Sequence, residues 1–110
     1  MTIFDSRERA FEAKFAHDEE FRFLVTARRD KLLARQVAAK LNLQGSAGDD
    51  LTASFLAVRD GPGHDALLLD LVVGTFLDHG VVVERADAAN WLQRCAGLAA
   101  EQLLSGQPPG

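Results

Sequence analysis

The chain has 110 residues, of which 47% are apolar and 25% are charged, the size and composition of one globular domain with a single core. These proportions exclude wholesale disorder and fibrous architectures. The net charge of −4 disfavours nucleic acid as the main partner, although residues 1–40 carry a net charge of +2 and residues 41–110 one of −6.

Residues 4–43 contain neither glycine nor proline and are rich in strong helix formers, which predicts helix in two pieces. In the first piece, Phe4, Phe11 and Phe15 fall within about 40° of one another on a helical wheel. This stripe is narrow, and a short helix with so little apolar surface is not stable by itself.

The second piece, residues 18–43, is apolar on two opposite faces, so it needs cover on both sides. The first face carries Phe21, Val25, Leu32, Ala39 and Leu43. The second carries Phe23, Ala27, Ala34, Val37 and Leu41, and Asp30 interrupts it. We expect the glycine-containing segment at residues 44–48 to end this helix.

Two helices are predicted in the middle of the chain. Asp49 or Asp50 is expected to cap a short helix with Leu51, Phe55 and Val58 on one face. The Gly-Pro-Gly break at residues 61–63 precedes a helix that begins at His64 or Asp65, runs to about His79 and ends at Gly80. It is apolar nearly all round, so we expect it to be the most buried helix, with only the side of Asp70, Gly74 and Asp78 in solvent.

The three valines at residues 81–83 favour a strand, but no second strand is predicted to pair with them, so we expect an extended link. The final predicted helix, residues 85–104, points six side chains inward: Ala88, Trp91, Leu92, Cys95, Leu98 and Leu103. Residues 105–110 are expected to form a disordered tail. Together these elements predict an all-α fold, a helical bundle with short connections.

No motif in the sequence indicates catalysis, so we expect no enzyme activity, no cofactor and no metal site. The run His-Asp-Glu-Glu at residues 17–20 has no second histidine four positions on, and a solvated turn is the better interpretation. Cys95 is expected to be a buried, inert thiol. The second predicted helix carries a basic turn made of Arg28, Arg29, Lys31 and Arg35. We expect this basic turn to form a solvated face or to contact an acidic protein rather than nucleic acid.

The apolar stretch at residues 66–77 is too short to cross a bilayer and contains Asp70. The N-terminus lacks the basic-then-apolar order of a secretory signal, and a lone cysteine cannot form an internal disulfide. We therefore expect a cytoplasmic protein.

The residues from Phe4 to Glu20, followed by Ala-Arg-Arg-Asp-Lys-Leu-Leu at residues 27–33, resemble the zeta-subunit family of alphaproteobacteria, small inhibitors of the F-type ATP synthase. The most specific stretch is Lys-Phe-Ala-His-Asp-Glu at residues 14–19. The resemblance is strong over residues 4–43 and looser beyond them, where the Asp-His-Gly-Val turn at residues 78–81 matches.

This resemblance implies a four-helix bundle, residues 18–104, with a mobile and conditionally helical N-terminal arm, residues 1–17. The arm would insert into the catalytic head of the synthase, between catalytic subunits and rotor, and stop ATP hydrolysis. The protein would then lie peripheral to the inner membrane without inserting into it. Its candidate partner-binding residues are Phe4, Arg7, Glu8, Arg9, Phe11, Lys14 and Phe15.

Three positions depart from the family pattern. Asp30 stands where the family usually has Asn, Ala34-Arg35-Gln36 stands in place of a Gly-x-Trp run, and Glu84 replaces a Ser cap. Without the tryptophan, we expect different packing beside the second helix.

A different hypothesis is a small adaptor or ligand-binding bundle in which residues 1–23 pack permanently as core. Weak nucleotide binding by the bundle is a further alternative. Amide exchange of residues 2–16 separates the first two hypotheses, because an arm exchanges fast and a core segment is protected.

Overall fold

The computed structural model describes residues 19–106, and within this range it contains four helices and no strand. These helices are α2 (Glu19–Lys40), α3 (Ser46–Leu56), α4 (His64–Asp78) and α5 (Arg85–Leu104). The prediction of an all-α fold is confirmed, and residues 81–84 form the expected irregular link. The predicted arm, residues 1–17, lies outside the described residues, as do residues 107–110.

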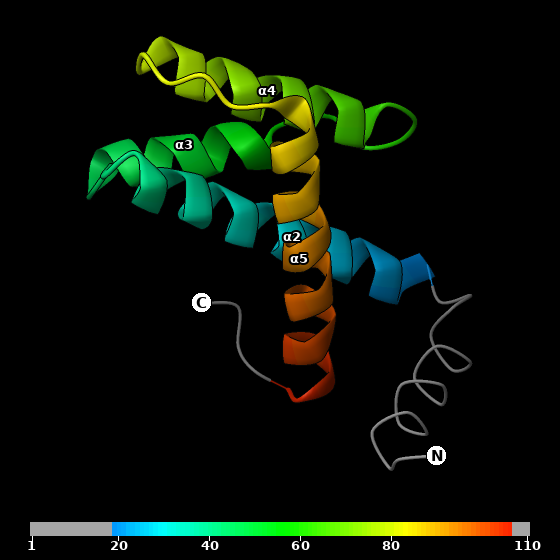
Figure 1. The fold of residues 1–110 in the computed structure, drawn as a ribbon. Helices are drawn as coiled ribbons and strands as arrows, with labels where there is room; N and C mark the ends of the chain where they lie inside the picture. The colour runs from blue at the N-terminus through cyan, green and yellow to red at the C-terminus, as the bar shows by residue number, and fades with distance from the viewer. Residues whose placement is uncertain (1–18, 107–110) are drawn as a thin grey trace, which may run out of the picture.

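α3 and α5 both pack against α2, the longest of the four helices (Figure 1). α3 folds back beside α2 after a short link, and α5 crosses α2 at a steep angle. Packing is most extensive between α2 and α5, followed by α2 and α3, whereas α4 packs mainly on α5. α2 therefore makes the most extensive helix–helix packing, although α4 buries the larger share of its residues, five of 15 against six of 22 in α2.

All four helices contribute to one hydrophobic core. Its buried members are Leu33, Ala34 and Val37 of α2, Phe55 of α3, Leu68, Val72 and Phe76 of α4, and Ala88, Leu92 and Cys95 of α5. At the edge of this core the Phe76 and Trp91 rings lie 5.6 Å apart, and the Lys40 ammonium lies 4.7 Å from the Trp91 ring centroid.

The end of α2 differs from the prediction. The helix ends at Lys40 rather than at residue 43, because Asn42 adopts a left-handed conformation with φ 56°. The Asn42 amide donates to the Ala39 carbonyl at 3.2 Å, and the Leu43 amide donates to the Ala38 carbonyl at 2.8 Å. These two bonds form a Schellman cap, in which asparagine replaces the usual glycine.

α3 begins four or five residues earlier than predicted, at Ser46, after the N-cap residue Gly45 with φ 60°. Asp49 therefore lies in the first turn, where its charge favours the positive end of the helix dipole, and does not act as the cap. The boundaries of α4 agree with the prediction: the helix begins at His64, and Gly80 ends it with φ 76°.

Helix burial differs from the prediction on three helices. On α2, Leu33 is fully buried although it belongs to neither predicted apolar face, while Phe23 is 59% exposed. On α4, Leu77 is 61% exposed, so solvent reaches more than the predicted polar side. On α5, Ala88, Leu92 and Cys95 are buried as predicted, but Leu98 is 45% exposed and Ala99 is buried. The steep crossing of α5 over α2 explains the exposure of Leu98, because α5 contacts α2 over only part of the length of α5.

Candidate functional site

All seven candidate partner-binding residues lie in the arm and therefore outside the described residues: Phe4, Arg7, Glu8, Arg9, Phe11, Lys14 and Phe15. The described chain begins directly after the arm, with the first turn of α2. Phe23 and Leu24 are exposed there, next to one another in sequence. The start of α2 thus presents apolar surface adjoining the segment predicted to bind the partner.

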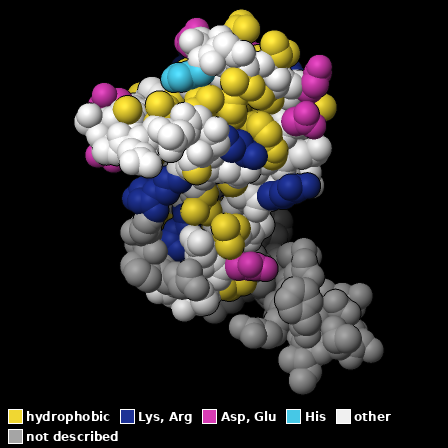
Figure 2. Space-filling model, turned by 60° about the vertical axis from the view of Figure 1, so that its left-hand side comes forward, with side chains coloured by type: hydrophobic (Ala, Val, Ile, Leu, Met, Phe, Trp, Pro, Cys, Tyr) yellow, Lys and Arg dark blue, Asp and Glu magenta, His cyan; other side chains and the backbone are white. Residues whose placement is uncertain are grey.

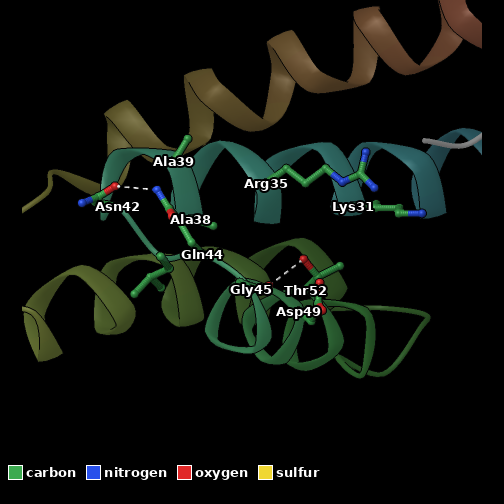
Figure 3. Close-up of a pocket in the computed structure, with 11 residues that line it drawn as sticks. Lys31, Arg35, Ala38, Ala39, Asn42, Gln44, Gly45, Asp49 and Thr52 are labelled. Carbon is green, nitrogen blue, oxygen red and sulfur yellow. Dashed lines mark hydrogen bonds between the residues drawn. The ribbon is translucent and has the colours of Figure 1, made fainter.

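An open groove of about 730 Å³ lies between α2 and α3 (Figure 3). Lys31 and Arg35 line it from α2, and Asp49 and Thr52 line it from α3. The link between the two helices closes one end, where the Gln44 side chain donates to the Asn42 side chain at 3.4 Å.

The groove carries mixed charge. α3 begins at this groove without a side-chain cap, so its first amide groups have no side-chain acceptor. These amides and the two basic side chains favour an anion, whereas the Asp49 carboxylate opposes one. The groove therefore suits a weakly bound anion. Such a ligand would also need hydrogen-bond donors that can interact with the Asp49 carboxylate.

A row of four charged side chains joins α2 to the start of α4. The Asp30 carboxylate accepts from Arg29 Nε at 2.9 Å and contacts His64 Nε2 at 2.6 Å. Arg29 also binds Asp65 through both terminal nitrogens, at 2.8 and 3.3 Å. Asp30 and His64 are buried, whereas Asp65 is exposed.

The protonation of His64 is set by its surroundings. Burial lowers the pKa of His64, but the hydrogen bond to the Arg59 carbonyl and the contact with Asp30 raise it, and the net effect is a raised pKa. For Arg29, burial likewise lowers the pKa, and the bonds to Asp65 and Asp30 outweigh it. Burial raises the pKa of the Cys95 thiol, as expected for an inert cysteine.

The interpretation of the basic turn as a solvated face is wrong for two of its members. Arg28 is buried, and its Nη1 has no hydrogen-bond partner among the described residues. Arg29 is engaged by two carboxylates. Sequence reasoning missed this cluster, although an aspartate on an apolar helix face was a signal that a buried partner exists.

Residues 34–36 include one contact with α5. Ala34 is fully buried, and the Gln36 amide oxygen accepts from Cys95 Sγ at 3.5 Å. This bond links α2 to α5 at the edge of the core.

One face of the molecule carries a discontinuous band of hydrophobic side chains with basic side chains beside it (Figure 2). Exposed apolar residues of the described chain include Leu77, Val81 and Val82, at the end of α4 and in the link that follows. No described helix is long and apolar enough to span a membrane. Residues 19–106 also contain no cluster of three or more candidate metal ligands.

The chain was compared with known proteins, solved structures and family models. Searches of curated proteins and of solved structures give no significant match. The family model described as ATPase inhibitor subunit zeta matches residues 1–102, which include the predicted arm and all of the four helices except the last two residues of α5. The chain therefore belongs to the ATPase inhibitor subunit zeta family.

Proposed function

We propose that residues 1–17 are the inhibitory arm of this protein and that they block ATP hydrolysis by inserting as a helix into the catalytic head of the F-type ATP synthase. The observation that carries the proposal is the family match, which begins at residue 1 and so includes the arm. Family membership supports inhibition of an ATP synthase and a regulatory rather than a catalytic role.

The packing of the bundle supports separate roles for the two parts of the chain, in which the bundle folds and the arm binds the partner. Within residues 19–106, all four helices contribute buried members to one core cluster. A bundle with its own core can fold while another segment of the chain binds a partner.

The composition of the arm supports binding as a helix in an apolar groove. Phe4, Phe11 and Phe15 share one narrow face, and aromatic anchors on one face are how helices dock into grooves. Arg7, Arg9 and Lys14 would pair with carboxylates around the groove, and Glu8 with a cation. The length from Phe4 to Phe15 is about 16 Å at helical rise.

Between catalytic subunits and rotor, such a helix would act as a wedge, because rotation requires the catalytic interfaces to change shape. In this state the protein would lie in the cytoplasm, peripheral to the inner membrane, held there by the synthase and not by lipid.

An ATP hydrolysis titration tests the proposal. The cognate synthase is assayed with the full chain and with a chain that lacks residues 1–16 and begins at His17. We expect the full chain to inhibit and the truncated chain to be inactive at the same concentration. Equal inhibition by both chains would place the inhibitory surface on the bundle and contradict the proposal.

The groove between α2 and α3 favours a second candidate function, weak nucleotide binding. Its supporting observation is the combination of Lys31 and Arg35 with the uncapped start of α3. A phosphate chain is an anion that such a site can hold, and Gln44 and Thr52 offer polar contacts to the rest of the ligand.

Amide chemical shifts measured during an ATP titration test this second candidate. We expect changes at residues 45–52, which weaken when Lys31 and Arg35 are both changed to Gln. Lys40→Gln is the matched control, because Lys40 is a basic residue of α2 outside the groove. Shift changes that persist in the double variant would exclude this groove as the site.

A further inference from the structure

Both ring nitrogens of His64 face hydrogen-bond acceptors. Nε2 lies 2.6 Å from the Asp30 carboxylate, and Nδ1 lies 2.9 Å from the Arg59 carbonyl oxygen. A neutral imidazole carries one ring proton and can donate to only one of them. Since neither acceptor can supply a proton of its own, the arrangement is fully satisfied only when His64 is an imidazolium.

Charges from every neighbouring element act on this ring. α2 contributes Asp30 and Arg29, the loop before α4 contributes Asp60 with Oδ1 4.0 Å from Nδ1, and α4 itself contributes Asp65, bound to Arg29. From α5, Cys95 lies close enough to interact with Arg29 and Asp30, as a neutral thiol.

The four charges of the row that joins α2 to the start of α4 balance only in one protonation state. With His64 protonated, the row His64, Asp30, Arg29 and Asp65 alternates in sign and sums to zero. With His64 neutral, one negative charge is left over in a row whose centre is buried. The buried Asp30 carboxylate then keeps only one of its two cationic partners, Arg29, which is unfavourable, so this cluster is coupled to the proton on His64.

We propose that Asp30, His64 and the Arg59 carbonyl form a proton-dependent clasp, which fastens the loop at residues 57–63 and the start of α4 to α2 and opens locally when His64 loses one ring proton. The Nε2 proton is retained, because its bond to a carboxylate is the stronger one. The Nδ1 lone pair then faces the Arg59 carbonyl, and the loop is released. The inference concerns the bundle alone and does not depend on the role of the arm.

The architecture allows a local opening. α4 packs mainly on α5, and the extensive contact of α2 with α5 does not involve the start of α4. The Arg29–Asp65 ion pair remains as a second link between α2 and α4, but Asp65 is exposed, so this link is weak.

The direction of the pH dependence follows from the raised pKa of His64. A group whose pKa is higher in the folded state stabilises the fold in its protonated form. This contribution is fully present below the unfolded value of about 6.5 and is lost as the pH rises through the higher folded value. The clasp is therefore closed below about pH 6.5 and opens as the pH rises through the higher folded pKa of His64.

Nuclear magnetic resonance of the full, isotopically labelled chain between pH 5.5 and 9 tests the proposal. We expect the ring nitrogen shifts of His64 to titrate above about 6.5. The His64 amide, which donates to the Gly61 carbonyl at 3.1 Å, reports on the loop. Corrected for its intrinsic pH dependence, its exchange should rise about 5- to 10-fold across the same midpoint, as expected for one lost hydrogen bond.

Two matched variants assign the effect to the clasp. Asp30→Asn keeps the shape of the side chain but removes its charge. It should lower the titration midpoint of His64 by about one pH unit or more and remove the pH-dependent step in the exchange of the His64 amide. Asp78→Asn removes the same charge at the far end of α4 and should change neither.

Three results would overturn the proposal: a neutral His64 at pH 6 in the parent, an unchanged midpoint in Asp30→Asn, or an exchange profile without a step at the midpoint. Two of these are measured on the parent chain, so they decide the matter even if Asp30→Asn does not fold.

Discussion

Phe11 is the central aromatic residue of the stripe predicted on the arm, about 20° from Phe4 and about 40° from Phe15 on a helical wheel. A buried aromatic anchor at the centre of an interface contributes about 2 kcal/mol or more. We therefore predict that Phe11→Ala weakens inhibition by about 30-fold or more. A titration of ATP hydrolysis measures this effect.

Thermal melting separates an interface role of Phe11 from a structural one. In a free arm Phe11 makes few contacts, so the melting temperature of Phe11→Ala should stay near that of the parent. Arg9→Ala is the comparison variant and should weaken inhibition less, because ion pairs at a solvated rim contribute little. Full inhibition by Phe11→Ala together with a much lower melting temperature would assign Phe11 to the core.

Leu67 and Leu68 are adjacent residues of α4 with opposite environments: Leu67 is 40% exposed and Leu68 is fully buried in the core. We predict that Leu68→Ala lowers the free energy of unfolding by about 2–5 kcal/mol, through lost burial and the cavity left behind. Leu67→Ala should cost much less, because its methyl groups already contact water. Urea unfolding of both variants checks the pair, and equal losses would contradict the register of α4.

At the scale of an element, Asn42 decides where α2 ends. Its φ of 56° is a conformation that costs a residue with a Cβ atom about 1–2 kcal/mol, less for asparagine and nothing for glycine. We predict that Asn42→Gly is neutral or slightly stabilising, while Asn42→Val destabilises the bundle by about 1 kcal/mol or more. Chemical denaturation measures both changes.

The Schellman cap can be checked directly by amide exchange at Leu43, whose amide binds the Ala38 carbonyl. Protection at Leu43 should be retained in Asn42→Gly and reduced in Asn42→Val. If both variants kept the same protection and stability, the left-handed residue would not be what terminates α2.

At the scale of the whole molecule, the core of the part that the structure describes, residues 19–106, is shared among α2, α3, α4 and α5. We predict that deletion of residues 1–16 leaves a chain with a cooperative thermal transition near that of the parent. Circular dichroism during heating measures it. Loss of the cooperative transition would show that the N-terminal segment is structural and would favour the adaptor hypothesis.

The long-range polar links show how much tertiary structure adds to local pattern. Arg85 of α5 pairs with Asp70 of α4 and donates to the Ala66 carbonyl at 3.1 Å. Asp30 and His64 stand 34 positions apart, and nothing local to either residue indicates the other. Pairs of this kind are formed by the packing of whole helices and are not encoded in a short segment.

The amino-acid sequence by itself determined the all-α class, the number and approximate limits of the helices at residues 19–104, the glycine at the end of α4 and the family resemblance. These features depend on local propensity, on hydrophobic period and on residue identity, all of which act within a few positions. The predicted arm residues rest on the same kind of pattern and stay a prediction.

Only the tertiary structure decided which apolar residues are buried and which polar ones are paired. Leu33 is buried and Phe23 exposed because α5 crosses α2 over a limited length, and a steep crossing covers a patch rather than a whole helix face. Asp30 is buried where the start of α4 meets α2, in contact with His64. Periodicity specifies which side chains share a face of a helix, but the position and angle of the neighbouring helix decide which part of that face is removed from water.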